Sequence, residues 1–343
     1  MKLTRSISYI HFSKLFKTSL YVTFILFIGF INNGCENEQT KNNNIGILLF
    51  GDSRQPQVDG FIDEMQKSGF DKKLTNYTIL NAKNNRKALK NMVQELIAKK
   101  PDLLVAAGGL EADTMKKLTE SHNIPVVVLY VNAITERGLV KSRANTGWNA
   151  TGVDNLNAEL SGKRVELIKD LLPTTKRILI LYYEKIAPSR IGVLEATKVA
   201  KKFGITIDAR AVKSRKEITK IMSSLKPGEH DVMLTVPTAP IDNALKDIIL
   251  PDIDRLGIPL FTHSRPLAEL GAFASYGADF YELGQQSARL AKKIINGVSA
   301  NHIPFEIPKN FTYTINTDVQ KRLSIIIRDR QQYVINDYIQ TRQ

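Results

Sequence analysis

Apolar and polar positions alternate in blocks along most of this chain. From residue 45 onward, short apolar runs are followed by longer segments in which apolar residues recur every three or four positions. The short runs are typical of buried strands, and the longer spacing is typical of amphipathic helices. Repeated strand–helix alternation predicts an α/β fold with doubly wound parallel sheets that are covered by helices on both faces.

The alternation occurs twice along the chain. The first half predicts strands at 45–50, 77–80, 102–107 and 125–130, with helices ending at 68 and spanning 84–99 and 111–120. After a helix at 159–172, the second half predicts strands at 177–181, 205–209, 232–236 and 259–261, with helices at 189–203, 215–225 and 241–256. A chain of 343 residues is long enough for two lobes of roughly 100–150 residues each. We therefore expect two lobes joined by a multi-strand hinge.

Segments 272–275, 281–295 and 305–308 remain to cross between the lobes. We expect residues 45–153 plus 272–302 to form the N-terminal lobe, and residues 154–271 plus 303–327 to form the C-terminal lobe. Thr151 and Gly152 are the predicted hinge, because glycine tolerates the backbone changes that lobe closure needs. The basic tail at 328–343 extends past this pattern and is predicted to be a surface helix.

The first 44 residues have the features of an export signal followed by a tether. A basic stretch, 1–17, precedes an apolar run at 20–31, which is shorter than the roughly 20 residues that span a bilayer. Gly34-Cys35 then resembles a bacterial lipobox, although Asn32 stands where leucine is usual. We expect a lipoprotein signal peptide at 1–34, lipidation of Cys35 and a flexible tether at 35–44; the alternative is a secretory signal cut nearby, with Cys35 left free.

Composition narrows the class of protein. Lys and Arg outnumber Asp and Glu by 48 to 34, but the lysine pairs are scattered rather than gathered in one stripe, so no nucleic-acid partner is expected. Cys35 is the single cysteine and excludes an intrachain disulfide. The five histidines lack metal-ligand spacing, and the sequence contains no nucleophile elbow, P-loop or dinucleotide-binding glycine motif. We expect no enzyme activity, cofactor or metal.

Several stretches together resemble one known family. They are 100–105 leading into Gly108-Gly109, 124–127, 149–153, 271–277, 281–284 and 314–316. In this order and spacing they are similar to ABC-transporter substrate-binding proteins of the tryptophan/tyrosine-binding type, a branch of the type I periplasmic binding fold. The resemblance covers about residues 45–327. It implies a ligand held between two lobes, and a permease and an ATPase as partners.

The chain departs from the family's pattern at two loops. Where family members often have a His-Pro pair in the first strand–helix loop, this chain has Ser53-Arg54-Gln55-Pro56. Where they often have Gly-Thr followed by Pro or Ala, it has Gly108-Gly109-Leu110-Glu111. Losing a threonine hydroxyl and gaining a glutamate should change which ligand groups are satisfied, so the family's aromatic amino acids do not carry over directly.

Candidate ligand-binding residues follow the predicted strands, because ligands of such sheets bind at the carboxyl ends of the strands. They are Ser53, Gln55, Gly109, Leu110, Glu111, Asn132, Tyr183, Ser189, Thr238, Asp242, Ser264 and Glu269.

Three of these candidates have structural alternatives. Backbone N–H groups at Gly108-Gly109 could bind a carboxylate, or Glu111 could itself neutralise the helix end. If Glu111 points into the cleft, it would favour a ligand ammonium group. Ser189 could merely cap its helix, and Asp242 could be a helix-dipole partner.

The sequence as a whole predicts an exported, lipid-anchored solute-binding protein, facing the periplasm or the cell exterior. It would act as a monomer that captures a small molecule, an amino acid or a related compound, and delivers it to an ABC permease. The alternative is a ligand-sensing receptor that passes occupancy to a membrane signalling protein.

Overall fold

The computed structural model describes residues 42–70, 74–328, 331 and 335–341. The predicted signal peptide, Cys35 and nearly all of the tether therefore lie outside the described residues. Among the helices within the described ranges, none combines the length and the apolar character needed to cross a bilayer.

The first sheet of the described chain has five parallel strands in the order β2-β1-β3-β4-β5. These are β1 (Asn43–Leu49), β2 (Thr75–Asn81), β3 (Leu103–Ala106), β4 (Val126–Val131) and β5 (Ala150–Asp154). Alternate residues of the buried strands enter two different apolar clusters: Ile47 and Val105 pack in one, while Leu48 and Leu104 pack in the other. Burial on both faces explains the nearly continuous apolar runs in the sequence.

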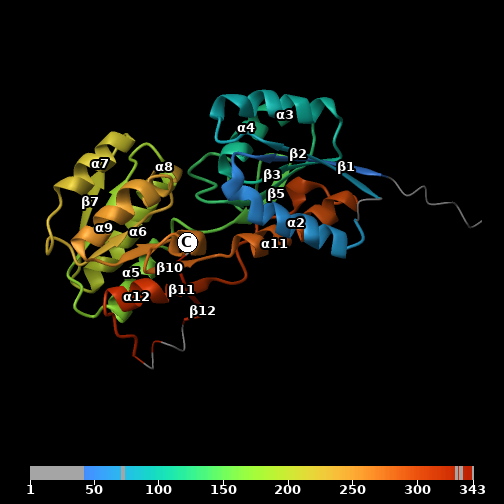
Figure 1. Ribbon diagram of the computed structural model, residues 1–343. Coiled ribbons are helices and arrows are strands. Elements are labelled where there is room, and N and C mark those ends of the chain that lie inside the picture. The colour runs from blue at the N-terminus through green and yellow to red at the C-terminus, as the bar shows by residue number, and fades with distance from the viewer. Residues whose placement is uncertain (1–41, 71–73, 329–330, 332–334, 342–343) are drawn as a thin grey trace, which may run out of the picture. The chain divides into compact units, whose positions relative to one another are not determined.

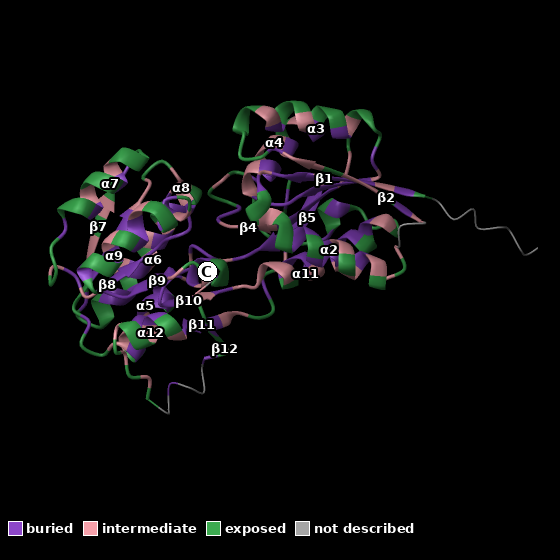
Figure 2. Ribbon diagram, viewed as in Figure 1, coloured by how far each residue is buried: buried purple, intermediate pink, exposed green. Residues whose placement is uncertain are grey.

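Helices cover both faces of this sheet. They are the 3-10 turns η1 (Asp52–Arg54) and η2 (Arg86–Ala88), and the α-helices α2 (Gln55–Lys67), α3 (Leu89–Ala98) and α4 (Gly109–Thr119). Figure 2 shows the strands as mostly buried and the outward face of α3 as exposed, which is the amphipathic arrangement that the spacing in 84–99 predicts.

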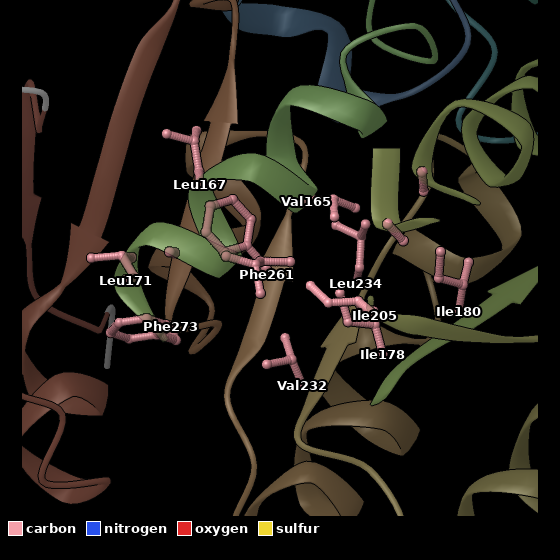
Figure 3. Close-up of a cluster of buried hydrophobic side chains, with 14 of the residues drawn as sticks. Val165, Leu167, Leu171, Ile178, Ile180, Ile205, Val232, Leu234, Phe261 and Phe273 are labelled. Atoms are coloured by element: carbon pink, nitrogen blue, oxygen red, sulfur yellow. The ribbon is translucent and has the colours of Figure 1, made fainter. Parts of the chain in front are cut away.

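The second sheet described has the strand order β12-β11-β10-β9-β8-β6-β7. Its strands are β6 (Arg177–Tyr182), β7 (Thr206–Ala211), β8 (Val232–Leu234), β9 (Leu260–Thr262), β10 (Ala274–Gly277), β11 (Thr312–Asn316) and β12 (Asp337–Ile339). All neighbouring pairs are parallel except β10 with β11. Figure 3 shows part of its core, where Phe261, Leu234 and Ile178 of three strands meet Val165 from the helix above them.

The helices of the second lobe follow its strands in turn. They are α5 (Ser161–Leu171), α6 (Ala187–Lys202), α7 (Arg215–Ser224), α8 (Ala239–Asp242), the π-helical turn η3 (Leu245–Ile249), α9 (Leu250–Leu256), α10 (Arg265–Glu269) and α12 (Thr317–Arg322). The two α/β parallel-sheet lobes confirm the predicted fold class.

Helix α11 (Phe280–Ile295) returns the chain to the first lobe, and the short turn η4 (Ala300–His302) follows it. In Figure 1, α11 lies directly beside α2, against which it packs closely. Gly60 of α2 and Gly284 of α11 make this approach possible, since a Cβ on either would lie less than 3.0 Å from a backbone oxygen of the other helix.

The boundaries between the lobes differ from the prediction on both sides of α11. Strand β10, expected in the N-terminal lobe as part of 272–302, pairs with β9 and β11 in the second sheet. Conversely, Glu306 lies beside β5, where its N–H donates to Gly152 O and it forms a bridge to Val153. The chain therefore leaves the second sheet after Gly277, and it returns there only after residue 306.

The described end of the tail is a strand rather than part of the surface helix that the sequence favoured. Residues 337–339 form β12, which pairs in parallel with β11, and Asn336 exchanges hydrogen bonds with the Tyr313 backbone. The edge of a sheet offers unpaired backbone groups, and these give Tyr338 and Ile339 a β-type environment that no local pattern reveals.

Candidate functional site

The candidate residues of the first lobe gather at the carboxyl ends of three neighbouring strands, β1, β3 and β4. Ser53 and Gln55 follow β1 and are exposed, and Gln55 donates to Asp59 of its own helix at 2.7 Å. Asn132 follows β4 and is half-buried. Leu110, after β3, packs against the apolar cluster beneath α4, so it serves the core as well as the loop.

Glu111 is buried beneath the carboxyl ends of the strands. Its side chain is 0% exposed, and its Oε1 accepts the Phe50 N–H at 2.7 Å. The other oxygen, Oε2, has no hydrogen-bond partner among the described residues. Arg54 is within ion-pair distance of Glu111, since its Nε lies 3.9 Å from Oε1. A ligand at the strand ends would therefore meet Arg54 before it reached Glu111.

Arg54 is the main residue of this loop that the candidate list missed. Its Cζ lies 4.7 Å from the centroid of the Tyr130 ring, and its Nη1 donates to the Tyr130 hydroxyl. Burial works to lower the pKa of Arg54, but the charges of Tyr130, Glu111 and, last, Asp242 more than reverse this and raise it above the usual value. Arg54 therefore stays a cation.

The glycine pair at the start of α4, Gly108 and Gly109, leaves room for two arginine side chains. Gly108 has an extended backbone, with φ of −171°, which any residue can adopt. Glycine is needed at this position because a side chain would lack space. A Cβ there would lie 3.1 Å from both Arg54 Nε and Glu111 Oε2, and a Cβ on Gly109 would lie 2.9 Å from Arg137 Nη2. Arg137 in turn pairs with Asp113 at 2.6 Å.

In the second lobe, candidates follow β6, β8 and β9, which are again neighbours in their sheet. Ser189 is fully buried, and its Oγ accepts the Tyr183 N–H at 3.0 Å. It thus ties the end of β6 to α6, which is a structural role, while the side chain of Tyr183 stays partly exposed. Ser264 is buried before α10, and Glu269 pairs with Arg265 inside that helix at 3.1 Å.

Asp242 stands in a chain of polar groups. Its Oδ1 lies 3.0 Å from His263 Nε2, and His263 Nδ1 lies 3.1 Å from Asn157 Nδ2. Because Asn157 Oδ1 accepts from Arg164 Nη2, the amide nitrogen must face His263. His263 Nδ1 is then an acceptor and Nε2 carries the proton that is donated to Asp242.

Two polar atoms at the end of β8 lack hydrogen-bond partners among the described residues. Its side chain is 26% exposed, and Oδ2 accepts no hydrogen bond from a described residue. Thr238, at the start of α8, is buried and its Oγ1 has no partner within the described chain. Two polar positions after β8, Thr238 Oγ1 and Asp242 Oδ2, thus have no hydrogen-bond partner among the described residues.

The predicted hinge residues lie inside β5. Gly152 pairs with Val128 of β4, and a Cβ on it would lie less than 3.0 Å from the Val128 backbone. Its glycine is thus explained by close strand packing. Thr151 Oγ1 donates to Pro304 O at 3.0 Å, so this strand holds one of the segments that connect the lobes.

Within the described ranges, no three His, Cys, Asp or Glu side chains are placed to hold a metal ion. The polar strand ends, by contrast, occur in both lobes and carry charges of opposite sign, Arg54 in the first and Asp242 in the second.

This arrangement defines a two-lobed α/β binding protein of the type I periplasmic kind. Residues 43–334 match the family of ABC transporter substrate binding proteins, and the chain belongs to that family. The predicted family and fold are confirmed.

Known relatives agree with this assignment. A tyrosine-binding protein of Clostridioides difficile (strain R20291) is 28% identical over 315 residues, 89% of each chain. An ABC domain in complex with L-Trp from Streptococcus pneumonia is 23% identical and has a TM-score of 0.78, covering 87% of this chain and 100% of that one. A ligand-free, open substrate binding protein with adhesive properties from Clostridium difficile is 24% identical with a TM-score of 0.70, covering 88% and 100%.

Proposed function

We propose that this protein is the extracytoplasmic solute-binding lipoprotein of an ABC importer, and that it captures an amino acid or a closely related compound. The observation that supports the ligand class most directly is the pairing of charges at the strand ends. Arg54 of the first lobe is a cation, and Asp242 of the second is close enough for its charge to add to the raised pKa of Arg54. An α-amino acid carries the complementary carboxylate and ammonium groups.

Binding would favour closure of the lobes because only a closed form contacts the ligand from both sides. The hinge would include Thr151 and Gly152, which lie where connecting segments meet. The occupied protein would deliver its ligand to a membrane permease driven by a separate ATPase. Lipidation of Cys35 and the tether at 35–44 would keep the monomer near that permease.

The ligand class can be tested by a thermal-shift screen of the purified protein against the common L-amino acids, with L-tyrosine and L-tryptophan first. A ligand at about 100 times its dissociation constant should stabilise the protein by about 2.7 kcal/mol, which is a rise of a few degrees in Tm at this size. Recovery of the ligand unchanged would support a binding protein. Consumption of the ligand, or no shift with any amino acid, would contradict the proposal.

A further inference from the structure

Arg54 and Glu111 lie in the two loops where this chain departs from the pattern of the family it resembles. A carboxylate taken out of water is costly unless it is paired. Glu111 accepts one strong hydrogen bond, from Phe50 N–H, and among the described residues Arg54 is the cation that lies within ion-pair distance of it. The glutamate thus gives the arginine a fixed place in the loop, and Gly108 leaves the space in which the two side chains approach.

Arg54 is held from several directions. Glu111 lies on its Nε side, the Tyr130 hydroxyl accepts from Nη1, and the Tyr130 ring lies 4.7 Å from Cζ. Its side chain keeps 15% of its surface exposed, and Nη2 has no hydrogen-bond partner among the described residues. A guanidinium that is already immobilised loses little conformational entropy when it binds a ligand.

The relative exposure of Glu111 and Arg54 decides which of the two charges a ligand contacts. Glu111 is fully buried, whereas Arg54 is partly exposed at the carboxyl end of β1. A guanidinium matches the two oxygens of a carboxylate better than any other common group. At Arg54, Nη2 remains for such a contact, because Nη1 donates to Tyr130 and Nε is buried. We infer, on the basis of the proposed function, that Arg54, positioned by Glu111, binds the carboxylate of the ligand. The site would then bind an amino acid in preference to the corresponding amine.

The test measures selectivity, because a merely structural arginine would not change it. Isothermal titration compares L-tyrosine with tyramine, and L-tryptophan with tryptamine, which lack only the carboxylate. The native protein should prefer an amino acid to its amine by about 100-fold, and Arg54→Gln should remove that preference while binding of the amine changes little. Arg54→Lys should restore part of it, since it keeps the charge but loses the planar fork.

Two further variants control for a buried unpaired charge and for the loss of a positive charge. Arg54→Gln leaves Glu111 buried without its cation, so the double variant Arg54→Gln/Glu111→Gln removes both charges and keeps both shapes. Arg322→Gln removes an equal charge from an exposed pair with Asp254 and should bind like the native protein.

The outcomes separate the inference from the proposed function. Suppose that the native protein binds an amino acid, but that Arg54→Gln and Arg54→Gln/Glu111→Gln keep its preference over the amine. The inference is then wrong and the proposed function stands. The inference also fails if Arg54→Gln weakens the amino acid and the amine equally. If the native protein binds no L-amino acid in the thermal-shift screen, the proposed ligand class is overturned, and the inference with it. If it binds a different amino acid, the same comparison uses that amino acid and its amine.

Discussion

Arg164→Met is expected to lower the free energy of unfolding by about 3 kcal/mol or more. Arg164 is fully buried. Its Nε donates to Tyr276 O at 2.8 Å, its Nη1 donates to Asn157 O at 2.7 Å, and its Nη2 donates to Asn157 Oδ1. Methionine would leave these three acceptors buried without donors, and each costs about 1–3 kcal/mol.

A second effect works in the opposite direction. Burial lowers the pKa of Arg164 to about 9, so keeping a charge in this place has a cost that methionine would remove. At neutral pH the arginine is still protonated, and its hydrogen bonds offset that cost in the native protein. The variant would keep the orphaned oxygens and also lose part of the side chain's volume, so we expect the destabilising effects to win.

Denaturant unfolding followed by circular dichroism measures the change. Arg164→Lys should lose at least as much as Arg164→Met, because one ammonium cannot replace the fork that reaches both Asn157 and Tyr276. Arg322→Met is the control: its exposed ion pair with Asp254 should contribute no more than about 1 kcal/mol. If Arg164→Met unfolds together with this control, the hydrogen bonds of Arg164 contribute little net stability.

Arg164 also connects the fold to the site. It holds Asn157, which contacts His263, which in turn holds Asp242. None of the four residues is close to all the others in sequence. Asp242 could be predicted as a candidate because it follows a strand and lies in a short helix after it. Asn157, Arg164 and His263 have no local signal that marks them as a network.

The same limit applies in the first lobe. The pattern places Glu111 correctly in the first turn of a helix, yet the direction of its carboxylate depends on the Phe50 N–H, 61 residues away. The role of Arg54 depends on Tyr130, 76 residues away. Sequence spacing could thus predict which loops lie at the carboxyl ends of neighbouring strands, but not which of their side chains are exposed there.

Strands were predictable to the extent that burial made them apolar. The runs at 102–107 and 177–181 agree with β3 and β6 within one or two residues. Strand β10 has the sequence Ala-Ser-Tyr-Gly, and β12 is only three residues long. Both pair with β11, and β10 pairs also with β9. This non-local pairing is the reason that the lobe boundary and the strand at residues 337–339 were not predicted.

Gly284→Ala is expected to destabilise the protein by about 3 kcal/mol, at the upper end of the usual cost of overpacking. In an unconstrained helix interior the same change would stabilise by about 1 kcal/mol, because alanine has the higher helix propensity. Here the new Cβ would lie less than 3.0 Å from Gln57 O and from Phe61 N, both backbone atoms of α2. The clash must therefore move one helix away from the other, and Gly60→Ala should act in the same direction through Tyr281 O.

The sign of the stability change in Gly284→Ala distinguishes helix propensity from packing. Lys293→Ala in the same helix replaces an exposed residue and should change the stability by no more than about 0.5 kcal/mol. If α2 and α11 pack as closely as their glycines indicate, Gly284→Ala lowers the midpoint of denaturant unfolding while the control leaves it in place. A rise in that midpoint would mean that helix propensity outweighs packing and that α11 is held on the first lobe by other contacts. A fall would show that the close contact between α2 and α11 stabilises the first lobe.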